Sequence, residues 1–249
     1  MIDATRQTSV IFSIVAGLRA ASAAMSMRFG VEPPCALVEV ELSNTVKFRS
    51  ENFAGVTVGA LYGFTNQSSS TTGRSFSFGA TYGYGPLNLA AAYSEYRDRA
   101  FNLANGLGLT SFEGVALPTS GSFVAQSVRN AGIGGSYQIG RVQLHALLTQ
   151  VRIEARGRSE NYRTIDGGAN FQVTPAYMIG AGAWTTTLDG QRWTQVTIVN
   201  VYSLSKLTQL YADVMVEQAS SGATASTLGI DPSSSNRQTV VLAGIHRLF

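Results

Sequence analysis

Residues 75–84 read Ser-Phe-Ser-Phe-Gly-Ala-Thr-Tyr-Gly-Tyr, an alternation of small or polar residues with apolar ones. Successive side chains of a β-strand point to opposite faces, so the segment predicts a strand with one apolar and one polar face. The same alternation recurs along residues 44–249, for example in Val56–Phe64 and Val142–Thr149. The repeated pattern predicts about eleven antiparallel strands of roughly ten residues each, in an all-β fold.

The connections between these strands alternate between short turns and longer polar loops. The short ones cover residues 50–55, 85–86, 140–141, 174–175 and 205–207. The longer ones cover residues 66–74, 98–130, 154–161, 188–192 and 220–237. Short turns on one rim and long loops on the other predict an up-and-down transmembrane β-barrel, with its apolar face toward lipid and its polar face toward the lumen.

A soluble β-sandwich is the alternative, and it would bury the apolar face instead. Two features favour the barrel. Strands of about ten residues suit an oblique bilayer crossing better than a soluble sheet, whose strands usually have five or six. Moreover, every second strand ends on an aromatic residue of the apolar face at the short-turn rim, where an interfacial girdle would lie. These residues are Tyr84, Tyr137, Phe171, Tyr202 and Phe249.

The composition excludes several other classes of protein. Only 13% of the 249 residues are charged, against roughly 25% in soluble domains. The longest mostly apolar run near the start, residues 7–18, is too short for a membrane-spanning helix. One cysteine and two histidines leave no disulfide framework and little room for a metal or acid–base site. The sequence has no dense stripe of Lys and Arg of the kind that would predict nucleic-acid binding. We therefore expect no catalytic residue, no metal and no cofactor.

Under the barrel interpretation, strand parity places a small set of ionisable residues on the lumen face. These candidate pore-lining residues are Lys47, Arg49, Arg141, His145, Asp166, Asp213 and Glu217. Charges around a narrow aqueous channel set its ion preference. Lys47 and Arg49 are the best candidates for pore-lining cations. The alternative is that they are solvated lumen residues without a measurable effect on conduction.

Three stretches carry a family resemblance: residues 44–64 (Asn-Thr-Val-Lys-Phe-Arg-Ser-Glu-Asn-Phe-Ala-Gly-Val-Thr-Val-Gly-Ala-Leu-Tyr-Gly-Phe), residues 202–211 (Tyr-Ser-Leu-Ser-Lys-Leu-Thr-Gln-Leu-Tyr) and residues 244–249 (Gly-Ile-His-Arg-Leu-Phe). Together they resemble the general porins of Gram-negative bacteria, of the β-proteobacterial type. The resemblance implies an outer-membrane homotrimer through which ions and small hydrophilic solutes diffuse passively. It also implies contact with outer-membrane lipid, and with the barrel-assembly machinery through the strand ending at Phe249, although Arg247 stands where a hydrophobic residue or histidine is more usual.

The resemblance covers only part of a porin. The resemblance implies a closed barrel of about sixteen strands, whereas this chain supplies only the last eleven or twelve of those strands. Residues 1–35 form a segment outside the family, either a helix or a degenerate signal sequence, and residues 36–249 form the barrel portion. Apolar and polar residues also alternate from Ala36 onward, so a twelfth strand that begins near Ala36 stays an alternative.

Three alternatives to a porin fragment stay open. The first is a small twelve-strand barrel plugged by an N-terminal helix, similar to an autotransporter translocator. The second is a phospholipase-like barrel enzyme, against which the scarcity of histidine argues. The third is a truncated remnant of a porin without function.

Overall fold

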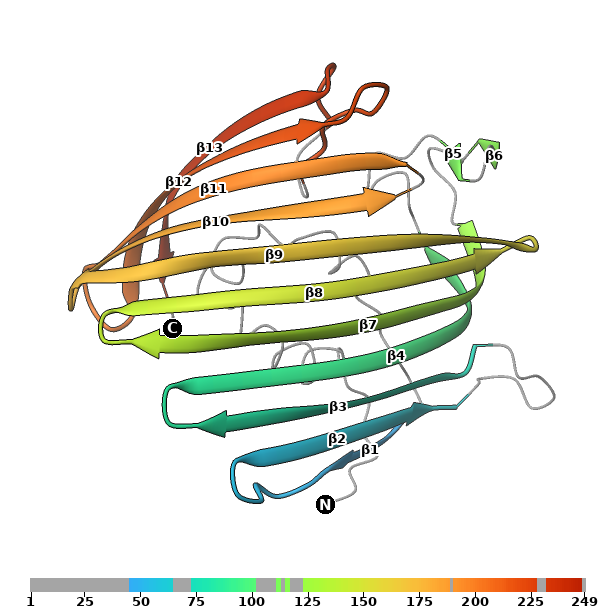
Figure 1. Ribbon diagram of the computed structural model, residues 1–249, viewed down its shortest axis with the longest axis horizontal. Coiled ribbons are helices and arrows are strands. Elements are labelled where there is room, and N and C mark those ends of the chain that lie inside the picture. Colours follow the sequence, from blue (N-terminus) through green and yellow to red (C-terminus); the bar gives the residue numbers. More distant parts are fainter. Residues whose placement is uncertain are drawn as a thin grey trace.

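The computed structural model describes residues 45–64, 73–101, 111–112, 115–116, 123–188, 190–227 and 232–247. Eleven strands form one curved antiparallel sheet in which they lie side by side in chain order (Figure 1). The strands of this sheet are β1 (Thr45–Arg49), β2 (Val56–Gly63), β3 (Ser75–Tyr84), β4 (Leu87–Phe101), β7 (Phe123–Ile139), β8 (Val142–Ala155), β9 (Arg158–Thr174), β10 (Tyr177–Leu188), β11 (Gln191–Ser203), β12 (Thr208–Ala219) and β13 (Arg237–Arg247). A separate two-stranded ribbon, β5 (Ser111–Phe112) and β6 (Val115–Ala116), lies between β4 and β7 in sequence.

The topology confirms the predicted all-β, up-and-down architecture. Each strand of the large sheet pairs only with its neighbours in this order, and every pairing is antiparallel. The sheet is not closed within the described part of the chain, because β1 and β13 are its two edges. None of the described residues belongs to a helix that is long and apolar enough to cross a membrane. The twelfth strand that the sequence left open, beginning near Ala36, falls outside the described residues.

The two faces of the sheet differ sharply in chemistry. On β9, Ile165 is 62% exposed, whereas the preceding residue, Thr164, is 3% exposed. The same parity holds on β3, where Phe78 is exposed and Ser75 is buried. We call the face that carries the exposed Phe78 and Ile165 the apolar wall and the opposite face the polar wall. A water-soluble sheet would bury its apolar side chains, so this sheet has the inverse arrangement.

Two expected loops are instead tight turns. The sequence predicted a loop over residues 154–161, but β8 continues to Ala155 and β9 begins at Arg158. The turn between them, Arg156–Gly157, has positive φ at both residues (50° and 77°), as a type I′ hairpin turn requires. The loop predicted over residues 188–192 is also shorter than expected, because β10 ends at Leu188 and β11 begins at Gln191. The prediction was wrong because the pattern reverses at the first of these strand ends: apolar Ile153 and Ala155 are buried on the face of the polar wall, whereas Arg152 and Glu154 lie on the face of the apolar wall.

Candidate functional site

The polar wall is built from short polar side chains that bond to one another across neighbouring strands. Asn130 on β7 donates from Nδ2 to the Ser94 hydroxyl on β4 at 3.1 Å. The hydroxyls of Thr164 on β9 and Thr186 on β10 are 2.7 Å apart. These cross-strand pairs are possible because the register places each pair of side chains on the same face of adjacent strands. The result is a series of hydrogen-bonded polar side chains along one side of the sheet, interspersed with buried apolar residues such as Leu147 and Met215.

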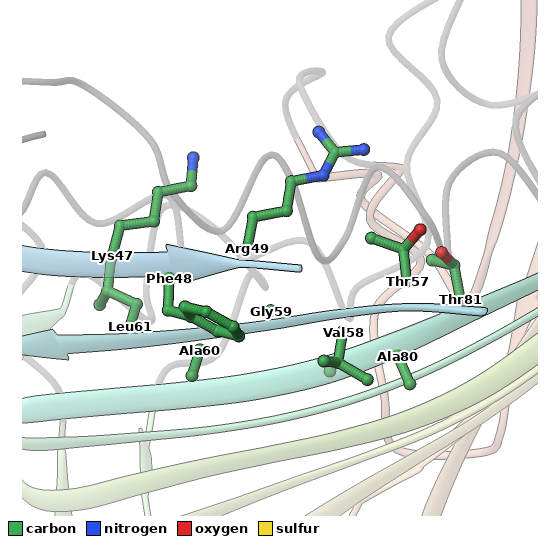
Figure 2. A pocket seen from close by; sticks show the side chains of 11 residues that line it. Lys47, Phe48, Arg49, Thr57, Val58, Gly59, Ala60, Leu61, Ala80 and Thr81 are labelled. Atoms are coloured by element: carbon green, nitrogen blue, oxygen red, sulfur yellow. The ribbon is translucent and has the colours of Figure 1, made fainter. Parts of the chain in front are cut away.

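Lys47 and Arg49 lie on the edge strand β1 and belong to this wall. Figure 2 shows their side chains on the same side of the sheet as Thr57, while Val58 and Ala80 point the opposite way. Lys47 and Arg49 also line a pocket at this edge of the sheet. The two cations that the sequence singled out therefore stand side by side, two residues apart on one face.

His145 and Asp166 are an imidazole and a carboxyl group, both candidate residues, that the described structure brings together. They lie on the neighbouring strands β8 and β9, with His145 Nε2 3.7 Å from Asp166 Oδ1. The His145 ring packs against a glycine of the same wall. A Cβ at Gly168 would lie 2.8 Å from His145 Cε1 and 2.6 Å from the carbonyl oxygen of Ala181. Only a residue without a side chain leaves the ring this space.

The other three candidates are dispersed. Arg141 lies in the short turn between β7 and β8 and donates to the carbonyl oxygen of Val173 at 3.2 Å. Asp213 and Glu217 are both buried on β12, where they share the polar wall. The described structure thus scatters the candidate pore-lining residues along the wall rather than joining them in one cluster. Among the described residues, no group of three His, Cys, Asp or Glu side chains could hold a metal ion.

One of the longer predicted loops, residues 220–237, to which the sequence assigned no role, folds over the polar wall in its described part. The loop follows β12, and three side chains of the polar wall form hydrogen bonds with its backbone. Glu217 Oε1 accepts from the backbone N–H of Ser226 at 2.6 Å, and Trp193 Nε1 donates to the carbonyl oxygen of Thr224 at 2.9 Å. Gln238 on β13 accepts from the N–H of Thr227 at 2.7 Å. We call residues 220–227 and 232–236 the clamped loop.

The clamped loop is also braced internally. The N–H of Ala225 donates to the carbonyl of Ser235 at 3.0 Å, and the N–H of Ser233 donates back to the carbonyl of Ala225 at 2.9 Å. The loop joins β11 as well, because the N–H of Ser220 donates to the carbonyl of Arg192 at 2.8 Å. Ala225 is fully buried as a result. A loop held at so many points is a fixed part of the polar wall.

The comparisons with known proteins agree with this arrangement. A model of the Gram-negative porin family matches residues 12–222. The chain belongs to the Gram-negative porin family. The match begins within the segment 1–35 that the sequence analysis set apart from the family. Membership of this family places the porin in the outer membrane. No curated protein matches the chain.

Solved porin structures share the fold. The anion-selective porin from Comamonas acidovorans is 20% identical, with a TM-score of 0.67 over 84% of this chain and 60% of that one. OmpF of Salmonella typhi is 14% identical, with a TM-score of 0.62 over 99% of this chain and 74% of that one. A trimer form of OmpT from Vibrio cholerae is 16% identical, with a TM-score of 0.61 over 90% and 69%. The porin thus spans about 60% of the length of the Comamonas protein.

The aromatic residues expected at the short-turn rim lie on the apolar wall of the porin. Tyr84 is 73% exposed, and Tyr137, Phe171 and Tyr202 are all more than a third exposed. Each lies near the end of a strand that leads into a short turn. Phe249, the fifth residue of the expected girdle, falls outside the described residues.

Proposed function

We propose that the porin forms the wall of a water-filled channel through which ions and small hydrophilic solutes diffuse across the outer membrane. The observation that carries the proposal is the reversal of faces, with Ile165 exposed on the apolar wall and its neighbour Thr164 on the polar wall. Lipid solvates the apolar wall, so the hydrogen-bonding wall is left to face water. Transport of this kind needs no covalent chemistry and no cofactor.

Lys47 and Arg49 are the proposed selectivity residues of this channel. Both project from β1 on the polar wall (Figure 2), where a pair of fixed cations raises the local concentration of anions. His145, Asp166, Asp213, Glu217 and Arg141 complete the proposed pore lining. The mixed signs of these groups predict a weak electrostatic preference superimposed on exclusion by size.

The channel proposal extends to how the porin sits in the membrane. Tyr84, Tyr137, Phe171 and Tyr202 are the proposed interfacial girdle, because aromatic side chains favour the boundary between hydrocarbon and headgroups. A homotrimer is proposed as the assembly, which the trimer form of the similar OmpT fold supports. Contact with the barrel-assembly machinery through the strand that ends at Phe249 remains a proposal from family resemblance.

Single-channel recording in planar bilayers tests the channel and its selectivity. The full chain is refolded in detergent, inserted, and its zero-current potential is measured across a KCl gradient. Lys47→Gln with Arg49→Gln is expected to shift that potential toward cation preference. The matched control removes two cations from turns, Arg156→Gln with Lys206→Gln, and is expected to leave the potential unchanged. A folded, inserted chain without discrete conductance steps would show that it is a remnant without channel function.

A further inference from the structure

Three side-chain oxygens at the clamped loop are buried and have no hydrogen-bond partner in the part of the chain that the structure describes. They are Glu217 Oε2, Gln195 Oε1 and Thr227 Oγ1. The three residues are 0%, 1% and 2% exposed, respectively. Buried polar atoms of native proteins nearly always have a partner. A group of buried oxygens of this kind therefore indicates a ligand that interacts favourably with electron pairs.

The sheet register and the loop bring these three side chains together. Gln195 on β11 lies directly opposite Glu217 on β12, and such pairs have Cβ atoms about 4.5–5.5 Å apart. Gln238 on β13 lies opposite Glu217 on its other side. The N–H of Ser226 donates to Glu217 and the N–H of Thr227 donates to Gln238, at 2.6 and 2.7 Å. Consecutive loop residues thus lie over two neighbouring wall residues, which places the Thr227 hydroxyl beside Glu217.

The surroundings of Glu217 do not balance its negative charge. The residues that face it from the two adjacent strands, Gln195 and Gln238, are neutral. Its neighbours on the same face of β12 are Met215 and Ala219, which are apolar. A buried carboxylate without an opposite charge is costly. The single backbone N–H at Oε1 compensates only part of this cost, so we expect a cation at Oε2.

The three oxygens are the kinds of ligand that a hard cation prefers. Calcium binds six to eight oxygens from carboxylates, amide carbonyls and water. The amide nitrogen of Gln195 already donates to the Thr197 hydroxyl at 3.0 Å, which leaves the amide oxygen for a cation. The sequence expectation of no metal rested on the scarcity of cysteine and histidine, which an oxygen site does not need. With one carboxylate, the site predicts weak affinity, on the order of 10⁻⁴–10⁻³ M.

We propose that Glu217 Oε2, Gln195 Oε1 and Thr227 Oγ1 bind a calcium ion, which links the clamped loop to the polar wall. Water molecules complete the coordination of the ion. Calcium strengthens the attachment that the hydrogen bond from Ser226 already provides, because it joins the loop to both β11 and β12. The proposal stands on the position of the loop and does not depend on conduction through the channel.

Terbium luminescence tests the site directly. Tb³⁺ replaces Ca²⁺ at oxygen sites and emits light when a nearby tryptophan is excited. The two tryptophans of the chain both border the site, because Trp184 lies opposite Gln195 on β10 and Trp193 precedes Gln195 by two residues on the same face. The full chain, refolded in detergent, is titrated with Tb³⁺ and then with Ca²⁺. We expect saturable emission that Ca²⁺ displaces. Emission that does not saturate, or that Ca²⁺ does not displace, would overturn the proposal.

Variants locate the ligands. Glu217→Gln keeps an acceptor for Ser226 but removes the charge, and is expected to weaken Ca²⁺ binding about tenfold or more. Gln195→Leu removes one ligand and leaves the carboxylate and its bond to the loop, so we expect a smaller loss. The matched control, Asp213→Asn, neutralises another buried carboxylate on the same face of β12, roughly 13 Å away. It is expected to bind as the wild type does. Unchanged affinity in both site variants, or an equal loss in the control, would overturn the proposal.

Hydrogen–deuterium exchange tests the link between the ion and the loop. In the wild type, Ca²⁺ is expected to slow exchange of the Ser226 and Thr227 amides several-fold relative to a solution with a calcium chelator. In Glu217→Gln, Ca²⁺ is expected to have no effect on these amides. A slowing by Ca²⁺ that is absent from the wild type, or that persists in Glu217→Gln, would overturn the proposal. Conductance, recorded separately, reports on the channel and not on this site.

Discussion

The carboxylate of Glu217 accepts a 2.6 Å hydrogen bond from the backbone N–H of Ser226, and so ties the clamped loop to the polar wall. Glu217 has no exposed surface. The sequence suggested a pore-lining charge at this position. In the structure the hydrogen-bond partner of Glu217 is a backbone amide of the loop. We therefore expect its main role to be that of an anchor for this loop.

Removal of the anchor should widen the channel. Glu217→Ala deletes a hydrogen bond to a charged group, which is worth about 1.5–3 kcal/mol, so the loop should leave the wall for part of the time. We expect larger and noisier single-channel conductance. Glu217→Gln is the matched control, because its amide oxygen can still accept from Ser226. Identical conductance of Glu217→Ala and the wild type would contradict an anchoring role.

Trp193 provides a second, independent attachment of the same loop. Trp193→Phe keeps an aromatic ring but loses the 2.9 Å hydrogen bond from Nε1 to Thr224. The loss should cost about 0.5–1.5 kcal/mol locally, so the amides of Ser226 and Thr227 should exchange hydrogen for deuterium several-fold faster. Mass-spectrometric exchange on refolded protein measures this. The strand β9, which does not contact the loop through these bonds, serves as the internal reference, and unchanged loop exchange would count against the attachment.

Gly168 should be far less tolerant of a side chain than its neighbour Gly167. A Cβ at Gly168 would meet the Ala181 carbonyl oxygen at 2.6 Å, whereas one at Gly167 would lie 3.6 Å from its nearest neighbour, an ordinary contact. We expect Gly168→Ala to lower the free energy of unfolding by about 1–3 kcal/mol, as overpacking does. Gly167→Ala should have a much smaller effect. Urea unfolding measures the free energy of unfolding of each variant. Equal values for Gly168→Ala and Gly167→Ala would contradict the close packing of Gly168 against His145.

The assignment of walls predicts opposite responses to a new charge. Ile165→Arg places a cation on the lipid-facing wall and should cost about 2–4 kcal/mol in folding into bilayers. Thr149→Arg, on the polar wall of the adjacent strand β8, should cost much less because water can solvate it. The yield of folded protein in lipid vesicles, read by heat-dependent mobility on gels, compares them. Equal losses would mean that the walls are not solvated as assigned.

The alternation of residues 75–84 predicted a strand whose structure covers the same residues, Ser75–Tyr84. The order of eleven strands and the division into two walls were also predictable, because side-chain parity is a local property of an extended backbone. The family resemblance carried together by residues 44–64, 202–211 and 244–249 added the porin fold. The same parity placed Lys47, Arg49 and the other candidate residues, whose roles stay predictions.

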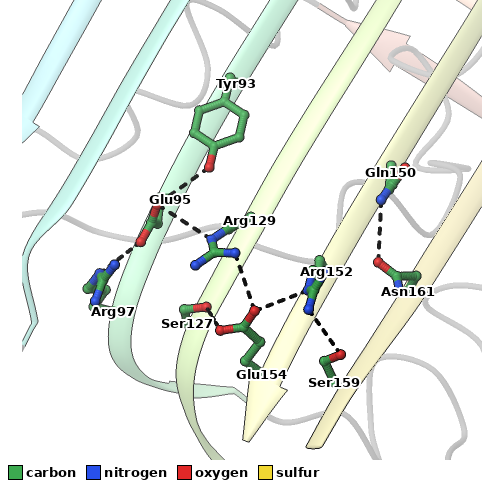
Figure 3. Close-up of polar contacts among 10 residues, drawn as sticks. All are labelled: Tyr93, Glu95, Arg97, Ser127, Arg129, Gln150, Arg152, Glu154, Ser159 and Asn161. Carbon is green, nitrogen blue, oxygen red and sulfur yellow. Dashed lines mark hydrogen bonds and ion pairs between the residues drawn. The ribbon is translucent and has the colours of Figure 1, made fainter.

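What the sequence could not determine depends on contacts between distant residues. The strands that lead into the turn at Arg156–Gly157 carry Ile153 and Ala155 on the face of the polar wall, the reverse of the pattern elsewhere, so the barrel pattern does not mark them. The ion pair between Glu95 and Arg129 (Figure 3) exists only because the register sets these two residues opposite each other on β4 and β7. Finally, the clamped loop reads as an ordinary polar loop in sequence. The position of this loop over the polar wall is set by hydrogen bonds to Trp193, Glu217 and Gln238. These residues lie on three separate strands, and only the pairing of those strands brings them together.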